Sequence, residues 1–446
     1  MAAPLGSTLR IAIAGAGMGG LATALALARK GFVHVDVYEA ASDLGFVGAG
    51  IQVAPNLSRQ LQNLGVWEYM KDEAVEMREV SIRAASTDEE LARSKLAYIE
   101  ECYGIPHHVA HRSSLANALY DGCKAAAPSV TFHFSTAVVS VDFERHRIEV
   151  RERGAAGASR WVEADIIIGA DGVKSAVRTC MLARHGEEDD AQETGQAAYR
   201  IMLRRDQLAH DSELLALLEA NTSFRWIGAR RQIIAYPISG KTILNIATTQ
   251  PDANFAAAPT ATWTTRADKS AMLKVYADFC PMVGRLLRLV PDGEVCEWRL
   301  RVHAPLTTWV EGRVALLGDA CHPTLPHLGQ GAAQAIEDGV VLAVVLSKLT
   351  QMKDICAGLR VYERLRKTRA EHLVDEAAVS GRALLLTDPE AQAARDAAFH
   401  RVQHGGPNPD KWVDKEVTDF VYGFDCVKDA EERYDGYLDT ALCYRA

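Results

Sequence analysis

The feature that most constrains the fold of this chain is a glycine turn near its N-terminus. The sequence IAIAGAGMGG, residues 11–20, begins with a short apolar run and continues with the spacing G-x-G-x-x-G at Gly15, Gly17 and Gly20. The residues that follow, GLATALALARKG, are typical of a helix, and VHVDVYEA is typical of a second strand. This order predicts a βαβ unit over residues 9–39.

Such a unit is suited to bind a dinucleotide. The free N–H groups and the partial positive charge at the start of the helix favour a pyrophosphate. Glu39 ends the second strand at about the distance from the glycines at which an acid accepts hydrogen bonds from a ribose hydroxyl. An acid at this position favours an adenosine ribose that carries no 2′-phosphate.

Length and composition set further limits. The chain has 446 residues, which exceeds the roughly 100–200 residues of one domain, so two domains are expected. Its net charge is −9 and its Lys and Arg residues form no cluster, which argues against nucleic-acid binding. No apolar stretch reaches the roughly 18–20 residues that span a bilayer, and the start of the chain lacks a signal-peptide core. We therefore expect a cytoplasmic protein with no membrane partner.

Cysteine and histidine spacing predicts no metal site. The 9 cysteines are scattered and form no C-x-x-C pair, which is poor evidence for disulfides or structural zinc. His322 and His327 lie near Cys321, but their spacing is not a usual zinc pattern.

The rest of the chain divides into segments of different character. Residues 107–185 are predicted to return to the strand and helix alternation, with a helix over 113–126. Residues 195–250 alternate β-branched and aromatic side chains, which predicts an inserted antiparallel sheet. After residue 300 a strand, VALLGDA, leads into the loop CHPTLPHLGQG and a long apolar helix.

We therefore predict an α/β fold with a Rossmann-like dinucleotide-binding domain, an inserted antiparallel β-sheet domain and a C-terminal helical region. The first domain takes residues 1–185 and 300–356, with residues 76–106 contributing to the second. The second domain takes residues 186–299. The helical region takes residues 357–446.

Two further motifs follow predicted strands. GADGVKSAVR (169–178) and GDACHP (318–323) each place an Asp–Gly or Gly–Asp pair where a strand ends. With the first glycine motif they resemble the FAD-dependent aromatic hydroxylases, the single-component flavoprotein monooxygenases typified by 4-hydroxybenzoate and salicylate hydroxylases. GAGIQVAPN (48–56) and HRSSLANAL (111–119) add to the resemblance, which spans roughly residues 9–350. The ending WVDKEVTDFVYGFDCVKDAE resembles fungal members similar to salicylate hydroxylase and 4-hydroxybenzoate 1-hydroxylase.

The resemblance implies bound FAD, transient NADH or NADPH, and O2. It implies that Glu39 holds the FAD ribose, that Arg112 lies near the pyrophosphate, and that Asp319 binds the ribityl chain. Asp171 and Gly172 would contact both FAD and the nicotinamide cofactor, while Pro323 and residues 329–332 would face the isoalloxazine. The predicted cofactor-binding residues are Gly15, Gly17, Gly20, Glu39, Gly50, Arg112, Asp171, Gly172, Asp319, Pro323, Gly329, Gly331 and Ala332. Alternatively, Asp171 and Asp319 are turn or cap residues and Arg112 is a surface cation.

The inserted sheet carries the substrate-side candidates. In RWIGARRQIIAYP a period of two predicts one shared face for Trp226, Gly228, Arg230, Gln232, Ile234 and Tyr236. The resemblance places Tyr236 against the substrate and matches Arg200 to an arginine that holds an anionic substrate. A guanidinium suits carboxylate or phenolate oxygens. Tyr236 as a core aromatic residue and Arg200 in a surface salt bridge are the alternatives. We predict substrate binding by Arg230, Gln232 and Tyr236.

His327 departs from the resemblance. Many salicylate-hydroxylase-like proteins have Tyr in the turn after Leu-Pro, where this chain has His327, and Gln232 stands where some relatives carry His. A histidine beside the flavin would take the phenol proton near neutral pH, or would simply fill the space of the tyrosine. The predicted catalytic residues are Arg200, Tyr236 and His327.

The resemblance implies a monooxygenase that hydroxylates a phenolic acid, similar to hydroxybenzoate or salicylate, through a flavin C4a-hydroperoxide. Oxidative decarboxylation is favoured over plain ring hydroxylation. One alternative is a hydroxylase that tailors a polyketide-derived phenol. A second is a non-redox binding protein of the GDP-dissociation-inhibitor type, against which the GADG and GDACHP motifs argue. The expected partner is a small aromatic substrate, and the expected assembly is a monomer or homodimer.

Overall fold

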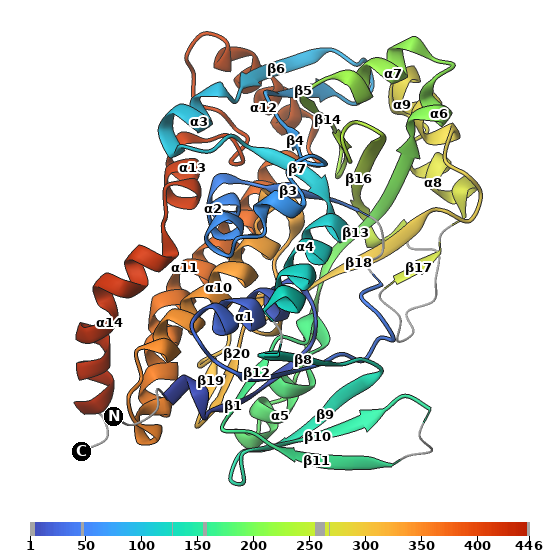
Figure 1. The fold of residues 1–446 in the computed structure, drawn as a ribbon. Helices are drawn as coiled ribbons and strands as arrows, with labels where there is room; N and C mark the ends of the chain where they lie inside the picture. The colour runs from blue at the N-terminus through green and yellow to red at the C-terminus, as the bar shows by residue number, and fades with distance from the viewer. Residues whose placement is uncertain are drawn as a thin grey trace.

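The computed structural model describes residues 5–45, 49–126, 128–154, 158–254, 264–266 and 268–443. Gly48, at the start of the GAGIQVAPN motif, lies outside these ranges. Figure 1 shows a parallel sheet and a larger antiparallel sheet, with long helices along one side. The mixed α/β fold and the C-terminal helices are confirmed.

The N-terminal βαβ unit forms as predicted. Strand β1 (Arg10–Ala14) pairs in parallel with β2 (His34–Tyr38), and α1 (Met18–Arg29) connects them. Both belong to a six-stranded sheet in the order β19-β20-β12-β1-β2-β8, in which β19 alone is antiparallel to its neighbour. Its other strands are β8 (Val130–His133), β12 (Ile166–Gly169), β19 (Val310–Glu311) and β20 (Val314–Leu316).

The second large sheet has the order β17-β18-β13-β16-β15-β14-β5-β6. Its pairs are antiparallel except for β14 with β5, so a segment from early in the chain completes the sheet. The strands are β5 (Glu79–Ala84), β6 (Glu90–Lys95), β13 (Ala191–Arg204), β14 (Thr222–Gly228), β15 (Arg231–Ile238), β16 (Ile243–Pro251), β17 (Thr264–Arg266) and β18 (Cys296–His303). One face packs on helices in an apolar core that includes Tyr199, Trp226 and Ile233. Part of the opposite face packs in a second apolar core, which joins Ile227, Tyr236 and Ile238 of the sheet to residues of α11 and α12.

Two small sheets correct one prediction. Residues 107–185 do not simply repeat the βαβ pattern, because only β8 and β12 of this range join the parallel sheet. The connection between β9 and β10 is short, and short connections allow only antiparallel pairing. The small sheets consist of β3 (Gly50–Val53), β4 (Val75–Glu76) and β7 (His108–His111), and of β9 (Thr136–Asp142), β10 (Arg147–Glu152) and β11 (Ser159–Glu163).

Helices pack against the parallel sheet and against one another. Helix α1 contacts α4 (Arg112–Ala125) and α10 (Gly331–Ser347), and α10 lies along α11 (Ile355–Leu384), as Figure 1 shows. The other α-helices are α2 (Pro55–Asn63), α3 (Ala97–Tyr103), α5 (Ala176–Arg184), α6 (Arg205–Leu208), α7 (Ser212–Glu219), α8 (Lys269–Val275), α9 (Pro281–Arg288), α12 (Pro389–Val402), α13 (Lys415–Tyr422) and α14 (Cys426–Cys443). Short 3-10 helices occupy Leu5–Ser7, Trp67–Tyr69, Gly172–Lys174, Asp252–Asn254, Gly318–Ala320, Pro326–Leu328 and Met352–Asp354.

Membrane-spanning helices and clusters of metal ligands are both absent from the described ranges. None of their helices is long and apolar enough to cross a membrane. Within the same ranges, His, Cys, Asp and Glu side chains do not gather in groups of three that could hold a metal ion.

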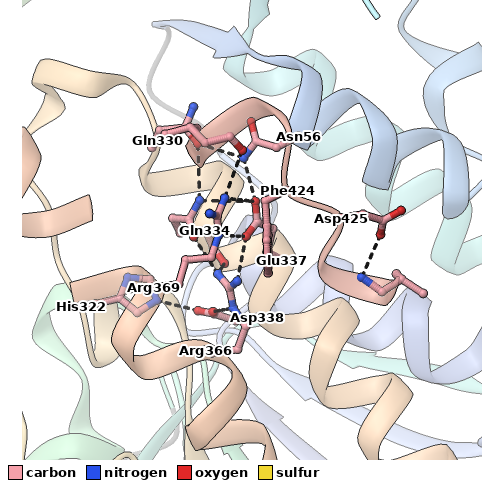
Figure 2. Close-up of polar contacts among 12 residues, drawn as sticks. Asn56, His322, Gln330, Gln334, Glu337, Asp338, Arg366, Arg369, Phe424 and Asp425 are labelled. Atoms are coloured by element: carbon pink, nitrogen blue, oxygen red, sulfur yellow. Dashed lines mark hydrogen bonds and ion pairs between the residues drawn. The ribbon is translucent and has the colours of Figure 1, made fainter. Parts of the chain in front are cut away.

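A buried cluster of charges joins α10 to α11. Arg366 donates to Glu337 at 2.8 Å and to Asp338 at 2.7 Å, and Arg369 donates to Glu337 at 3.1 Å (Figure 2). Burial raises the pKa of Asp338, but His322 and Arg366 outweigh it and hold that pKa at about 2. We call Glu337, Asp338, Arg366 and Arg369 the charge cluster.

Neutral groups extend the charge cluster to neighbouring segments. Asn56 of α2 donates to Glu337 at 2.7 Å and to Gln330 at 3.0 Å. Arg369 donates to the carbonyl oxygens of Phe420 and Val421 in α13 at 2.7 and 3.1 Å. The cluster therefore ties together α2, α10, α11, α13 and the loop that precedes α10.

Replacing Arg366 with Met tests the energetic weight of this cluster. Arg366→Met leaves two buried carboxylates with fewer partners, and we expect it to lower the free energy of unfolding by about 3–5 kcal/mol. Lys415→Met, which removes an exposed i,i+4 pair with Asp419, is the control and should change that energy by no more than about 0.5 kcal/mol. Urea unfolding curves of both variants make the comparison, and equal small losses would contradict the expectation.

Candidate active site

A cavity of about 360 Å³ lies between the carboxyl ends of the parallel strands and that second face of the eight-stranded sheet, the face opposite the core of Tyr199, Trp226 and Ile233. Its wall includes Gly17 from the first glycine turn, Gly172 after β12, and Asp319 after β20. The loop before α10 adds a further part of the wall. Ligands of α/β proteins bind at this edge of the sheet.

The glycine turn has the shape that a bound pyrophosphate requires. Gly15 has φ 99°, and a Cβ at Gly20 would lie 2.0 Å from the carbonyl oxygen of Gly15. Both positions therefore require glycine for the packing of the chain itself. A Cβ at Gly17 would meet nothing within 4 Å, and Gly17 lines the cavity. The N-cap of α1 is Gly17, which has no side chain that could cap the helix, so the first N–H groups of α1 can bind a phosphate.

Two predicted acids bind backbone groups of the chain. Glu39 accepts from the N–H groups of Ala16 and Ala41, each at 2.8 Å, so its carboxylate lies beside the glycine turn. Asp171 accepts from Ser175 and from the first N–H groups of α5. Asp171 therefore acts as a helix cap, which is the alternative role considered for it, and it does not line the cavity.

The other cofactor candidates differ in whether they line the cavity. Arg112 is half-buried in the cavity wall, and burial lowers its pKa while Asp319 opposes this effect, so it is not a surface cation. Pro323 is buried outside the cavity lining, and Pro326 of the same loop lines the cavity instead. The predicted residues that line the cavity are Gly17, Gly50, Arg112, Gly172, Asp319, Gly329, Gly331 and Ala332. Together the open glycine turn and this wall fit FAD.

The strand register corrects the predicted shared face. Strand β14 ends at Gly228 and β15 begins at Arg231, so the chain reverses at a turn in which Arg230 has φ 55°. The alternation therefore restarts. Trp226 pairs with Ile233 in the apolar core on the opposite face, and Arg230 is exposed at the turn. The prediction that Arg230 shares the substrate face is wrong.

The face of the sheet that lines the cavity instead presents rows of paired residues. Residues opposite each other on neighbouring strands share a face. One row runs from Arg225 through Ile234 and Ala247 to Arg200, across β14, β15, β16 and β13. Tyr236 pairs with Asn245 on one side of this row, and Gln232 pairs with Thr249 on the other. All of these residues line the cavity.

Arg200 brings a positive charge into the cavity, and Asp319 attracts it without forming an ion pair with it. Burial lowers its pKa to about 10, and Arg112 contributes to this shift, but the guanidinium stays charged at neutral pH. Its side chain lies over the ring of Trp298, with the guanidinium carbon 4.9 Å from the ring centroid. No carboxylate among the described residues forms an ion pair with it. The surface salt bridge that the sequence left open for Arg200 is therefore absent among the described residues.

Tyr236 is buried beside Arg200 in the cavity. Burial raises the pKa of its hydroxyl, while Arg200 and a hydrogen bond with Gln52 oppose that rise. The side chain is therefore a neutral phenol that can donate a hydrogen bond.

His327 is also buried, and its two ring nitrogens have partners. Nδ1 lies 3.4 Å from Nε2 of Gln232, and Nε2 lies 3.1 Å from Oε1 of Gln196. Burial, helped by Arg225, lowers the pKa of His327 to about 4. The ring is neutral near pH 7, with Nδ1 as acceptor and Nε2–H as donor, so it is poorly suited to take a phenol proton there.

The sequence reasoning missed the contribution of the C-terminal segment. Trp412 lines the cavity, and Asp410 binds Arg225 at 2.9 Å across 185 residues of sequence. A contact across that separation leaves no local pattern. The hairpin turn after Gly228 was the one signal that could have revealed Arg225, because the restarted alternation places it on the cavity face.

Comparisons with known proteins agree with this geometry. Residues 8–377 match the FAD binding domain family. The chain is 33% identical to FAD-dependent monooxygenase ntnJ from a Nectria species, over 90% of this chain and 91% of that one. It is 33% identical to 3-hydroxybenzoate 6-hydroxylase 1 of Aquipseudomonas alcaligenes, over 80% of this chain and 85% of that one.

A solved structure shows the same fold. It is a salicylate hydroxylase substrate complex, with a TM-score of 0.75 and 24% identity, covering 95% of this chain and 98% of that one. The family match, the relatives and the glycine turn agree on the cofactor. The chain belongs to the FAD-dependent aromatic hydroxylases, monooxygenases that bind FAD and use NAD(P)H and O2.

Proposed function

We propose that this enzyme hydroxylates a phenolic acid whose anionic oxygen is bound by Arg200. The observation that carries the proposal is a half-buried guanidinium that lines the cavity and has no ion pair among the described residues. FAD, when bound, supplies the oxygen-transfer chemistry with NAD(P)H and O2.

Arg200 and Tyr236 have complementary tasks in this proposal. The guanidinium fork binds and orients a carboxylate or phenolate. The neutral hydroxyl of Tyr236 donates a hydrogen bond to a developing phenolate, which makes the aromatic ring more electron-rich. Both act in a cavity whose lining includes the apolar side chains of Ile234 and Ala247, which help to exclude water from the bound substrate.

We assign His327 a positioning task instead of the proton transfer considered from the sequence. Its Nε2–H donates to Gln196, and its Nδ1 accepts from Gln232. It thereby fixes the amide side chains of Gln196 and Gln232, and Gln232 lines the cavity.

The relatives support the substrate class. The 3-hydroxybenzoate 6-hydroxylase relative is named for a phenolic acid. For acids similar to salicylate we propose that the hydroxyl group replaces the carboxylate, which follows from the sequence resemblance to salicylate hydroxylases. One CO2 released per product would support this detail, and a retained carboxylate would contradict it.

The first functional prediction concerns Arg200. Arg200→Met removes a charge-assisted hydrogen bond worth about 1.5–3 kcal/mol, so KM for a hydroxybenzoate should rise roughly 10- to 100-fold. The FAD content should not change. Arg230→Met, at the exposed hairpin turn, is the control and should leave KM unchanged. Steady-state NAD(P)H oxidation and flavin absorbance provide the data. Loss of flavin from Arg200→Met would assign Arg200 to the cofactor instead.

The second functional prediction concerns Tyr236. Tyr236→Phe keeps the ring but removes the donor to the phenolate, and loss of one such donor lowers kcat by about 10²–10³. Product formation should slow, and more NAD(P)H should be consumed with release of hydrogen peroxide. Product and peroxide measured together test this, and unchanged coupling would remove Tyr236 from the site.

The third functional prediction concerns pH. Because the pKa of His327 lies at about 4, the ring loses its proton well below neutral pH and does not titrate between pH 5.5 and 8. The pH profiles of kcat/KM for wild type and His327→Gln should therefore have the same shape over that range, whatever their absolute heights. A break near pH 6.5 in the wild type that disappears in the variant would restore a proton-transfer role.

A further inference from the structure

A second arginine, Arg225, lines the end of the cavity opposite Arg200, and its charge is paired with a carboxylate. Nη1 of Arg225 binds Oδ2 of Asp410 at 2.9 Å, and both side chains are buried. Oδ1 of the same aspartate accepts from the N–H of Trp412 at 3.2 Å. The C-terminal segment thus neutralises Arg225, whereas Arg200 has no such partner among the described residues.

The two arginines stand at the ends of one row of the sheet. Arg225, Ile234, Ala247 and Arg200 are in register across four strands. Three strand spacings separate the two arginines, which corresponds to about 14 Å between their Cα atoms. The residues between them are apolar, so the row offers a floor for an aromatic ring with a polar group at each end.

Two buried polar atoms at the Arg225 end have no hydrogen-bond partner among the described residues. One is the donor Nε of Arg225, and the other is the acceptor Oε1 of Gln232. These residues occupy neighbouring strands and the same face, and both line the cavity. Buried polar groups are normally satisfied, so an unpaired donor and an unpaired acceptor in two side chains that line the cavity indicate a ligand that satisfies both.

The chemistry of this pair selects a hydroxyl group. A hydroxyl can accept from Nε–H of Arg225 and donate to Oε1 of Gln232, whereas a carboxylate can only accept. An anion would also face the negative charge of Asp410. The anion-binding end of the cavity is therefore the Arg200 end.

We propose that Arg225 and Gln232 form a subsite for a second, neutral hydroxyl group of the substrate, across the ring from the anionic group held by Arg200. The substrate class is then a dihydroxylated aromatic acid, or a larger phenol with a hydroxyl at this end. This inference rests on the proposed function, because it takes the cavity as the substrate site.

Binding of two matched acids to the FAD-loaded enzyme tests the subsite. Salicylate and 2,4-dihydroxybenzoate differ only by a hydroxyl para to the carboxylate, and binding of either is followed by the change in flavin absorbance. The wild type should bind the dihydroxy acid at least about 10-fold more tightly, the value of one hydrogen bond to a charged group.

The variants remove the subsite and keep a control. Arg225→Met/Asp410→Asn removes the donor without leaving an unpaired buried carboxylate, and the ratio of the two dissociation constants should fall to about one. Arg231→Met/Asp278→Asn removes an ion pair between Arg231 of the same hairpin and the exposed Asp278, which follows α8, and should keep the wild-type ratio. Gln232→Met removes the acceptor, together with the Gln232 amide donor to His327, and leaves Arg225 and Asp410 in place. It should also lower the ratio, which provides a second test if the double variant does not fold.

The outcomes separate this inference from the function on which it rests. Equal affinity of the wild type for the two acids, or an unchanged ratio in the Arg225 and Gln232 variants, would overturn the subsite while hydroxylation of a simple phenolic acid stands. If neither acid perturbs the flavin at millimolar concentration, the phenolic-acid function and the subsite are both wrong.

Discussion

The attraction between two arginines and two carboxylates in the charge cluster is the interaction on which the cavity depends. Arg366 and Arg369 are buried against Glu337 and Asp338, far from water that could solvate them. A buried charge without its partner lowers the free energy of unfolding by about 3–5 kcal/mol. The charge pairs therefore strongly favour this arrangement of α10 and α11. The cluster therefore fixes the start of α10, where the chain enters the cavity wall.

The same cluster determines what surrounds the cofactor and the substrate. His322 binds Asp338 at 2.6 Å and anchors the loop that carries Asp319. Arg369 binds carbonyl oxygens of α13 and so holds the segment after Trp412. One group of buried charges thus positions a cofactor loop on one side of the cavity and the C-terminal wall on the other.

Much of this architecture follows from local sequence, and the exceptions have physical causes. The βαβ unit and the position of Asp319 were predictable because a glycine turn at the end of a strand has a local spacing pattern. Arg225 was missed because a short turn restarts the alternation of a hairpin, so a period carried across residues 226–236 assigns the wrong face. Its partner Asp410 could not be found, since ion pairing across 185 residues depends on tertiary packing alone. Asp171 caps α5, which is one of the two roles that the sequence left open for an acid at the end of a strand, and its contact with the cofactor stays a prediction.

Incubation of the purified, FAD-loaded protein with NAD(P)H, isotopically heavy O2 and a series of mono- and dihydroxybenzoates tests phenolic-acid hydroxylation most directly. Mass spectrometry of the products should show a single heavy oxygen atom in a new ring hydroxyl, and Arg200→Met should form far less of this product at the same acid concentration. If NAD(P)H oxidation yields hydrogen peroxide with every acid and no labelled product forms, phenolic-acid hydroxylation is contradicted.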